Sequence, residues 1–188
     1  MSTPWPWNRP ADEGEQAPGL QAFDAGFRGD WEWVQPARFR RRWELLCGGT
    51  AVARLVAPGI LHGRNVARFA DSAWRYRMRL GGGLEVTREG EPAPWGRYCP
   101  GWFTGGSVQR AHDAPLLWRR QDFWMMRWAL LTSEHLPLLR FEVRPAFLRL
   151  GARVTIEDAA RRMDDLPALV ALGWLAVVMA HRGHSHYH

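Results

Sequence analysis

The amino-acid sequence predicts an all-β protein with one C-terminal helix, namely a closed antiparallel β-barrel of about 12 strands that encloses the hydrophobic C-terminal α-helix. Three features of the sequence lead to this prediction. Apolar and polar residues alternate with a period of two, glycine-containing turns separate the alternating segments, and one long apolar segment follows them. Recurrent short strands separated by glycine turns are typical of antiparallel sandwiches and barrels.

The alternation is clearest in the segment Ser72–Leu80. On a strand Arg75, Arg77 and Arg79 would lie on one face, with aromatic and aliphatic residues on the other. On a helix the same arginines would be spread around the axis, so the strand is favoured. Other predicted strands are Trp31–Val34, Arg42–Leu46, Ala51–Val56, Val66–Ala70, Leu84–Thr87, Leu116–Arg119, Phe123–Leu131, Leu138–Val143, Phe147–Leu150 and Val154–Ile156.

Turn residues separate these strands. The clearest turns are Cys47–Thr50, Gly81–Gly83 and Glu89–Glu91, which place glycines where a hairpin needs unusual backbone angles. In Pro92–Val108 proline, glycine and tryptophan interrupt every periodic pattern, and no strand is predicted there.

The apolar segment Leu166–Ala180 contains 15 residues and no charge. We expect a helix over about 165–181, starting after Asp164 and Asp165, which favour helix starts. Its length of roughly 22 Å is short of the ~30 Å hydrocarbon core of a bilayer and matches a strand of about seven residues. A helix inside the barrel is therefore favoured over a tail anchor, which stays the alternative. The expected core residues of this helix are Leu169, Leu172, Trp174, Leu175 and Val178.

Three regions follow along the chain. Residues 1–28 are rich in proline and lack the apolar run of a signal peptide, so we expect a flexible N-terminal arm. Residues 29–182 form the predicted barrel domain with its helix, and residues 183–188 form a histidine-rich tail.

The charge is unevenly distributed. All 25 basic residues are arginine, and the formal net charge is +6. Residues 27–154 contain 21 arginines and 11 acidic residues, a net charge of +10 between two mildly acidic ends. A basic surface of this kind attracts phosphate groups of lipids, nucleotides or nucleic acids. A GC-rich genome also raises the arginine count, but it does not explain the concentration in the middle.

The predicted strand face of Arg75, Arg77 and Arg79 is the first candidate anion-binding site. Guanidinium groups at alternate strand positions lie roughly 7 Å apart, similar to the spacing of lipid headgroup phosphates. A solvated barrel exterior that resists edge pairing is the alternative interpretation. Further candidates for the same ligand are Arg119, Arg120 and Arg127, and a second basic cluster contains Arg38, Arg40, Arg41 and Arg42.

The histidines of the C-terminal tail form a candidate metal site, at His181, His184, His186 and His188. Imidazoles at alternate positions can converge on Zn²⁺, Ni²⁺ or Cu²⁺, but a chain end lacks the supporting contacts of a preorganised site. Adventitious affinity is therefore the favoured interpretation. Cys47 and Cys99 have no neighbour that would lower a thiol pKa, and we expect inert thiols. No phosphate loop, dinucleotide fingerprint or nucleophile motif occurs, so we predict neither catalytic residues nor a cofactor.

The chain resembles the tubby C-terminal-like superfamily, which includes the LURP-one-related proteins and the phospholipid scramblases. The resemblance rests on the strand series Trp31–Ile156, the aromatic-rich segments around Trp118 and Phe123–Trp128, and the helix Leu166–Ala180. It covers residues 28–182 and implies a barrel around a central helix and association with membranes. No acidic calcium loop of the scramblase type is present, and no lipid-binding residue of tubby domains maps onto this chain.

We therefore expect a non-enzymatic, cytoplasmic barrel, peripheral to membranes, whose basic surface binds anionic phospholipid or another phosphate-bearing partner. Two alternatives remain open: a tail-anchored membrane protein, and a small-ligand carrier or enzyme that uses the barrel interior. Nucleic acid is a less favoured partner, because Trp74 and Tyr76 lie opposite the arginine face and cannot stack bases beside it.

Overall fold

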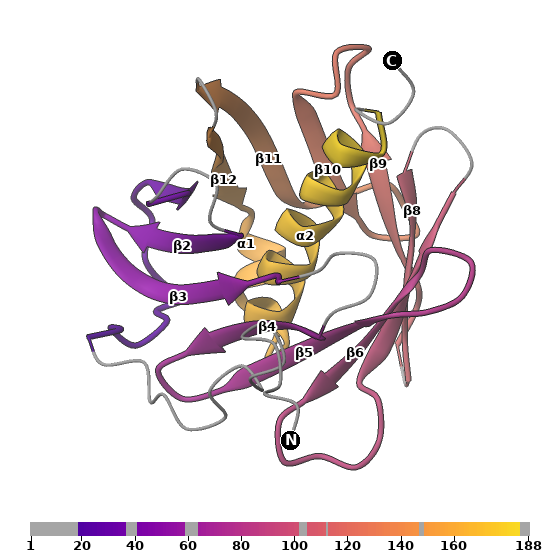
Figure 1. Ribbon diagram of the computed structural model, residues 1–188, viewed down its shortest axis with the longest axis horizontal. Coiled ribbons are helices and arrows are strands. Elements are labelled where there is room, and N and C mark those ends of the chain that lie inside the picture. The colour runs from indigo at the N-terminus through magenta and orange to yellow at the C-terminus, as the bar shows by residue number, and fades with distance from the viewer. Residues whose placement is uncertain are drawn as a thin grey trace, which may run out of the picture.

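The computed structural model describes residues 19–36, 41–58, 64–101, 105–111, 113–146 and 149–184 of the 188-residue chain. These residues form twelve β-strands and two helices (Figure 1). The strands are β1 (Trp31–Val34), β2 (Arg42–Cys47), β3 (Thr50–Val56), β4 (Arg64–Phe69), β5 (Ala73–Met78), β6 (Leu84–Arg88), β7 (Gly96–Pro100), β8 (Gly105–Arg110), β9 (Leu116–Arg120), β10 (Arg127–Leu131), β11 (Pro137–Ala146) and β12 (Arg149–Ile156). The helices are α1 (Asp158–Arg161) and α2 (Leu166–His184).

The strands form a closed antiparallel barrel, as the sequence predicts. Each strand pairs with the next one along the chain, and β12 pairs with β1, where Trp31 lies opposite Val154. The alternation of apolar and polar residues explains this arrangement. In β5, Trp74 and Tyr76 are buried while Arg75 and Arg77 are exposed, so the hydrophobic faces of the strands point to the barrel interior.

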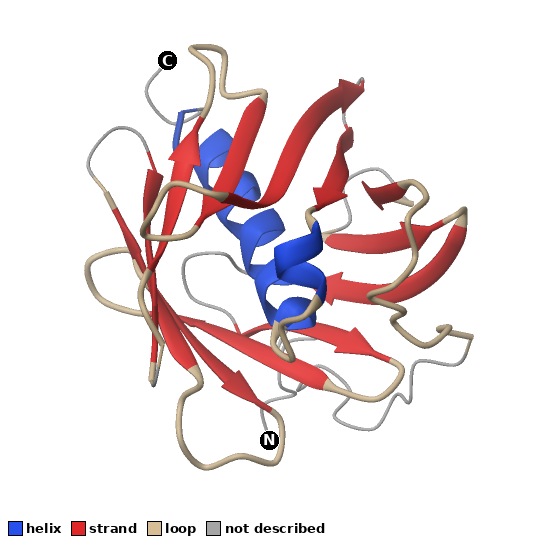
Figure 2. Ribbon diagram, turned by 180° about the vertical axis from the view of Figure 1, so that it is seen from behind, coloured by secondary structure: helices blue, strands red, loops and turns tan. Residues whose placement is uncertain are grey.

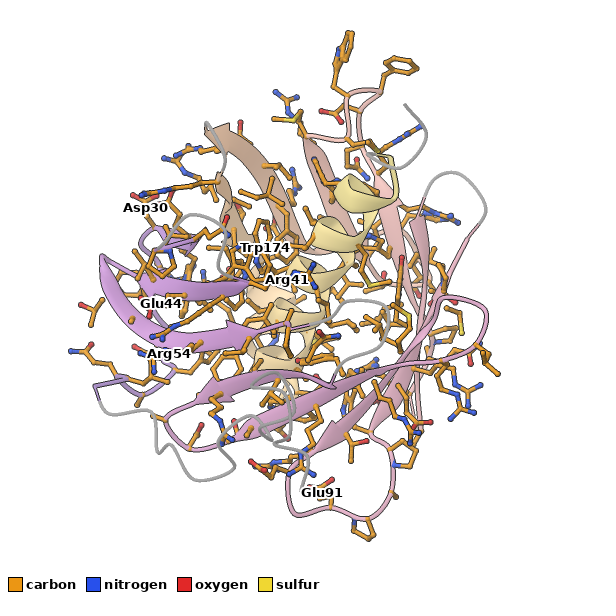
Figure 3. All side chains as sticks on the ribbon, in the orientation of Figure 1. Asp30, Arg41, Glu44, Arg54, Glu91 and Trp174 are labelled. Carbon is orange, nitrogen blue, oxygen red and sulfur yellow. The ribbon has the colours of Figure 1, made fainter. Side chains whose placement is uncertain are left out.

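Helix α2 is apolar on all sides and is buried along most of its length. The five residues expected in its core are at most 2% exposed. Trp174 packs against strands at the beginning of the chain: its ring stacks on Trp33 of β1 and meets Trp43 of β2 edge-on. In Figure 3, Trp174 lies in the middle of the molecule, whereas Asp30 and Glu91 lie at its periphery.

Other parts of α2 contact strands elsewhere in the barrel. The hydroxyl of Tyr76 in β5 donates a hydrogen bond to the carbonyl oxygen of Ala168, at 3.1 Å. At Gly173 the helix backbone is so close to Phe141 of β11 and Trp118 of β9 that an added Cβ would lie 2.6 Å from the Phe141 ring. Figure 2 shows α2 passing between the walls of strands. Its contacts thus include β1, β2, β5, β9 and β11.

The structure differs from the predicted strands in three places. β7 and β8 lie within Pro92–Val108, where no strand was expected. β10 begins only at Arg127, so the expectation of a strand from Phe123 is wrong, because the Asp122 carboxylate accepts hydrogen bonds from two backbone amides and forms a turn. The strands expected at Phe147–Leu150 and Val154–Ile156 are not separate, since β12 runs without interruption over Arg149–Ile156, and Phe147 and Leu148 lie outside the described residues.

The helical end also differs from the expectation. α2 runs to His184, beyond the expected end at 181, and a short helix α1 precedes it. The backbone carbonyl of Asp165 accepts the first helical hydrogen bond, from Leu169, while its side chain forms an ion pair with Arg110. The carboxylate that was expected to favour the start of the helix therefore also ties it to β8.

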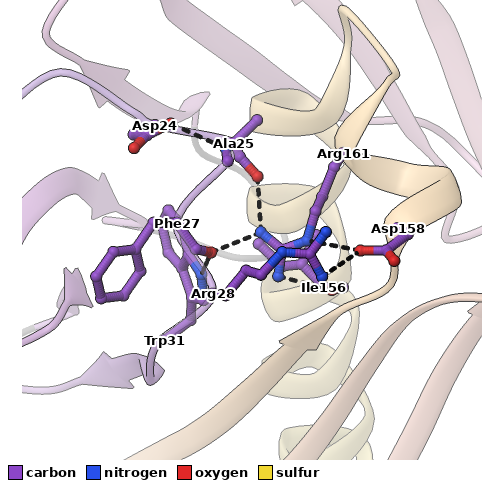
Figure 4. Close-up of polar contacts among 9 residues, drawn as sticks. Asp24, Ala25, Phe27, Arg28, Trp31, Ile156, Asp158 and Arg161 are labelled. Atoms are coloured by element: carbon purple, nitrogen blue, oxygen red, sulfur yellow. Dashed lines mark hydrogen bonds and ion pairs between the residues drawn. The ribbon is translucent and has the colours of Figure 1, made fainter.

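Residues 19–28, assigned from the sequence to a flexible arm, pack on the barrel instead. Phe23 lies against Trp31 and Phe69, with ring centres 5.0 Å and 5.5 Å apart. Figure 4 shows the guanidinium group of Arg161, which donates hydrogen bonds to the carbonyl oxygens of Ala25 and Phe27. The remainder of the expected arm, residues 1–18, lies outside the described residues.

Candidate functional site: a basic rim

The direction of the strands divides the charged residues between the two ends of the barrel. Because neighbouring strands are antiparallel and follow one another along the chain, successive connections lie at alternate ends. The β1–β2, β3–β4, β5–β6, β7–β8, β9–β10 and β11–β12 connections lie at one end, where α2 also terminates. The other five connections between strands lie at the opposite end, together with residues 19–30, α1 and the start of α2.

The first of these ends is basic. Among the described residues, its connections and terminal strand positions contain one acidic residue, Asp122. We call the basic residues there whose side chains are described the arginine rim, and they are Arg41, Arg42, Arg79, Arg120, Arg127 and Arg149. Helix α2 ends at the same end of the barrel (Figure 1).

The opposite end is acidic. Its described connections and terminal strand positions hold eleven acidic residues against five arginines, Arg28, Arg88, Arg110, Arg161 and Arg162. The barrel is therefore electrically polar along its axis. The acidic residues of this end are Asp24, Asp30, Asp71, Glu89, Glu91, Asp113, Glu134, Glu157, Asp158, Asp164 and Asp165.

Within the rim, the arginines differ in their partners. Arg42 forms an ion pair with Glu44 at 3.1 Å, and Arg79 forms one with Glu85 at 2.6 Å. Arg41 donates a hydrogen bond to the carbonyl oxygen of Pro58 at 2.7 Å. The remaining three rim arginines, at 120, 127 and 149, form no ion pair with another described residue. Their charges are thus available to an external anion.

The arginine face predicted on Ser72–Leu80 is largely neutralised. Arg75 and Arg77 are exposed on the outer wall, while Arg79 follows the end of β5 and belongs to the rim. The guanidinium of Arg75 lies 2.6 Å from the Glu89 carboxylate, which also pairs with Arg68 at 3.5 Å. The sequence did not reveal these partners, because they come from the neighbouring strand β6 and the turn after it.

Arg119 and Arg120 do not lie beside that face, because β9 and β5 are separated by three strands in the barrel. Arg119 is half-buried on the outer wall. Arg120 points to the rim, where it is the charged residue in the lining of a pocket of about 240 Å³. Apart from Tyr98, the rest of this lining is apolar or glycine and includes Met125, Trp128 and Met179. The pocket therefore offers one guanidinium group beside an apolar wall.

The second predicted basic cluster is described only in part. Arg41 and Arg42 belong to the rim, whereas Arg38 and Arg40 lie outside the described residues.

The predicted metal site is also described only in part, because the side chains of His184, His186 and His188 are not among those described. His181 is half-buried on α2, and its Nδ1 lies 3.0 Å from the carbonyl oxygen of Val177, to which it can donate. In the described part of the chain, no three His, Cys, Asp or Glu side chains gather in a way that could hold a metal ion.

Three residues have a raised pKa because of burial. Burial, and then the nearby charge of Asp24, raises the pKa of the Cys47 thiol, which opposes thiolate chemistry at neutral pH. Burial raises the pKa of Tyr98 to about 12, with a smaller contribution from Cys99, and it raises that of Tyr76 well above the ordinary value. All three shifts favour the neutral form, which suits a structural role.

Exposed apolar side chains gather at the rim. Phe123 and Trp124, in the β9–β10 connection, are 79% and 77% exposed. Leu80, in the β5–β6 connection, is fully exposed, and Val56 at the end of β3 is 37% exposed. Both aromatic residues were expected in a strand, so their exposure was not predicted. The signal that could have revealed it is Asp122, a residue that favours turns.

The space between α2 and the inner faces of β7–β10 is filled by side chains. A gap lined by Tyr98, Trp118, Leu172 and Gly173 is too small to hold a water molecule. This region gives no support to a carrier that uses the barrel interior. Among the described residues, no helix combines the length and the apolar character needed to cross a membrane.

Comparison of the chain with family models, curated proteins and solved structures finds no match. The resemblance to the tubby C-terminal-like superfamily is therefore a prediction from the sequence pattern.

Proposed function

We propose that this protein is a non-enzymatic barrel domain that binds reversibly to anionic phospholipid surfaces through the arginine rim. The observation that carries the proposal is the separation of charge along the barrel axis, with arginines at one end and carboxylates at the other. A negatively charged surface attracts the rim and repels the opposite end, so the barrel approaches a membrane in one orientation.

The dimensions of the barrel support this orientation. A strand of six residues is about 20 Å long. The electrostatic potential of a membrane falls off over roughly 8–10 Å at physiological salt. When the rim is in contact with the lipid, the acidic end is therefore screened, and its carboxylates cost little binding free energy.

The expected affinity is moderate. Each arginine near an anionic membrane contributes about 1 kcal/mol. The three rim arginines without an ion-pair partner, together with the exposed Arg41, would give a reversible association that salt weakens.

The test is co-sedimentation with vesicles of phosphatidylcholine, with and without phosphatidylserine, across a salt series. We expect binding only to the vesicles that contain phosphatidylserine, and weaker binding as salt rises. Replacement of three exposed rim residues, Arg41→Gln, Arg127→Gln and Arg149→Gln, should reduce the association constant roughly 100-fold at low salt.

The matched control removes three exposed arginines from the acidic end, Arg28→Gln, Arg88→Gln and Arg162→Gln, and so has the same net charge. We expect it to bind as well as the unchanged protein. A third variant, Arg75→Gln with Arg77→Gln, tests the strand face of the outer wall. Equal losses in the rim variant and the control would show that only net charge matters and would contradict the proposal. Failure of the unchanged protein to bind at low salt, or tighter salt-dependent binding to nucleic acid, would also contradict it.

A further inference from the structure

The β9–β10 connection carries an exposed aromatic pair at the rim. Phe123 and Trp124 have ring centres 5.4 Å apart and meet edge to face, while more than three quarters of each residue is exposed. Aromatic side chains of this size are usually buried, and two adjacent exposed ones indicate a contact with another protein or a membrane.

The backbone of this connection holds both rings away from the barrel. One carboxylate oxygen of Asp122 accepts hydrogen bonds from the amides of Met126 and Arg127, at 2.9 Å and 3.2 Å. The indole nitrogen of Trp128 donates to the carbonyl oxygen of Met125, at 2.8 Å. Met125 has a φ of 59°, a left-handed conformation that non-glycine residues adopt only when the surrounding contacts require it.

The sides of the connection are anchored, whereas its tip is not. Met125 and Met126 pack against the core of the barrel, and the next residues in the strands are Arg120 and Arg127. The Asp122 carboxylate accepts hydrogen bonds from two backbone amides at the base of the connection. The two aromatic rings lie between Arg120 and Arg127 in the sequence. The β9–β10 connection thus combines an apolar tip with two arginines at the ends of the flanking strands.

This combination matches the interfacial layer of a bilayer. Tryptophan and phenylalanine are favoured at the level of the lipid headgroups, and arginines beside them contact phosphates. The position at the rim, rather than at the acidic end, gives charge complementarity with anionic lipids. We propose that Phe123 and Trp124 insert into the interfacial layer of an anionic bilayer while Arg120 and Arg127 contact the headgroup phosphates. This inference rests on the proposed function and names the element that enters the membrane.

The experiment compares the double variant Phe123→Ser/Trp124→Ser with the control Leu136→Ser. Leu136 is 57% exposed and lies in the β10–β11 connection, at the acidic end. With phosphatidylserine vesicles we expect at least a tenfold loss of affinity for the double variant and no change for the control. The unchanged protein should retain a fraction of its binding at high salt, and the double variant should lose it, because insertion is apolar. The single variant Trp124→Ser provides a second test if the double variant folds poorly.

A direct measurement uses vesicles of phosphatidylserine mixed with phosphatidylcholine whose brominated acyl chains quench nearby tryptophan fluorescence. We expect quenching in the unchanged protein and less quenching in Trp124→Phe, which keeps an aromatic anchor and should still bind. Equal quenching in both proteins would overturn the inference.

The remaining outcomes separate the two proposals. If the unchanged protein does not bind anionic vesicles at all, the proposed function fails and the inference fails with it. If it binds and the double serine variant binds equally well at every salt concentration, the function stands and the insertion is wrong. If the unchanged protein dimerises without lipid and the double variant does not, the aromatic pair is a contact between two copies, and the inference is again overturned.

Discussion

The indole rings of Trp33 and Trp174 are stacked, with ring centres 6.1 Å apart and planes inclined by 9°. Trp33 lies in the first strand and Trp174 in the last helix, and neither residue is exposed to solvent. Trp43 of β2 meets the Trp174 ring edge-on, with ring centres 6.2 Å apart. The helix is thus attached to the region where the barrel begins.

We expect Trp174→Ala to lower the free energy of unfolding by about 3–5 kcal/mol, because it leaves a large cavity beside two other indole rings. Urea denaturation followed by circular dichroism measures this loss. The control is Trp124→Ala, which removes the same side chain from an exposed position and should change stability by less than about 0.5 kcal/mol. A folded, equally stable Trp174→Ala protein would contradict the packing of α2 against the strands and would favour the tail anchor.

Arg161 joins the N-terminal segment to the acidic end of the barrel. Its guanidinium group donates to the carbonyl oxygens of Ala25, Phe27 and Ile156, at 2.6–2.9 Å. Arg161→Met would remove these three hydrogen bonds, although the Phe27 carbonyl oxygen would keep one from the Trp31 indole nitrogen, and we expect a loss of about 2–4 kcal/mol. The neighbouring variant Arg162→Met, at an exposed position, should have little effect. Limited proteolysis should also show earlier cleavage within residues 19–30 in the first variant only.

A change of Gly173 to alanine should destabilise the protein, although a glycine-to-alanine change in a helix usually stabilises it. In an exposed helix this change stabilises by about 1 kcal/mol. Here the new Cβ would lie 2.6 Å from the Phe141 ring and 3.3 Å from that of Trp118. We therefore expect a net loss of roughly 1–3 kcal/mol in Gly173→Ala. In a Phe141→Leu background the same change should cost less, and a double-mutant cycle measures that coupling; an additive cycle would contradict the close contact.

Tyr98 makes the stability depend on alkaline pH. Its pKa is raised by burial to about 12, above the ordinary value of about 10 in the unfolded chain. Between these values the folded state holds a proton that the unfolded state has lost. Stability is therefore unaffected by this group below about pH 10 and falls by up to about 3 kcal/mol as the pH approaches 12.

Replacement by phenylalanine isolates this contribution. The Tyr98 hydroxyl lies 3.5 Å from the carbonyl oxygen of Gly105, a long contact, so Tyr98→Phe should cost little at neutral pH. Unfolding at a series of pH values should show a shallower decline for this variant above pH 10. Identical slopes in both proteins would mean that the phenol titrates normally.

The barrel could be predicted from sequence because burial alternates along most strands, as Trp74 and Arg75 illustrate. β7 and β8 were missed because their inward positions include Gly106, which leaves room for the ring of Tyr98 and so interrupts the apolar pattern. The pairing of Arg75 with Glu89 depends on the register of β5 and β6, which no local pattern reveals. The rim could have been recognised only once the order of the strands was assumed, because its arginines belong to several separate connections and strand ends.

The closure of the barrel through β1 and β12 has a consequence for synthesis of the chain. Trp31 and Val154, which lie opposite each other in this pair, are more than a hundred residues apart, and α2 leaves the ribosome after every strand has emerged. Until then, the inward faces of the strands have no helix to cover them. Contacts between such distant residues form slowly, and an uncovered sheet is prone to aggregate. We therefore expect the nascent chain to depend on chaperones until its last helix is available.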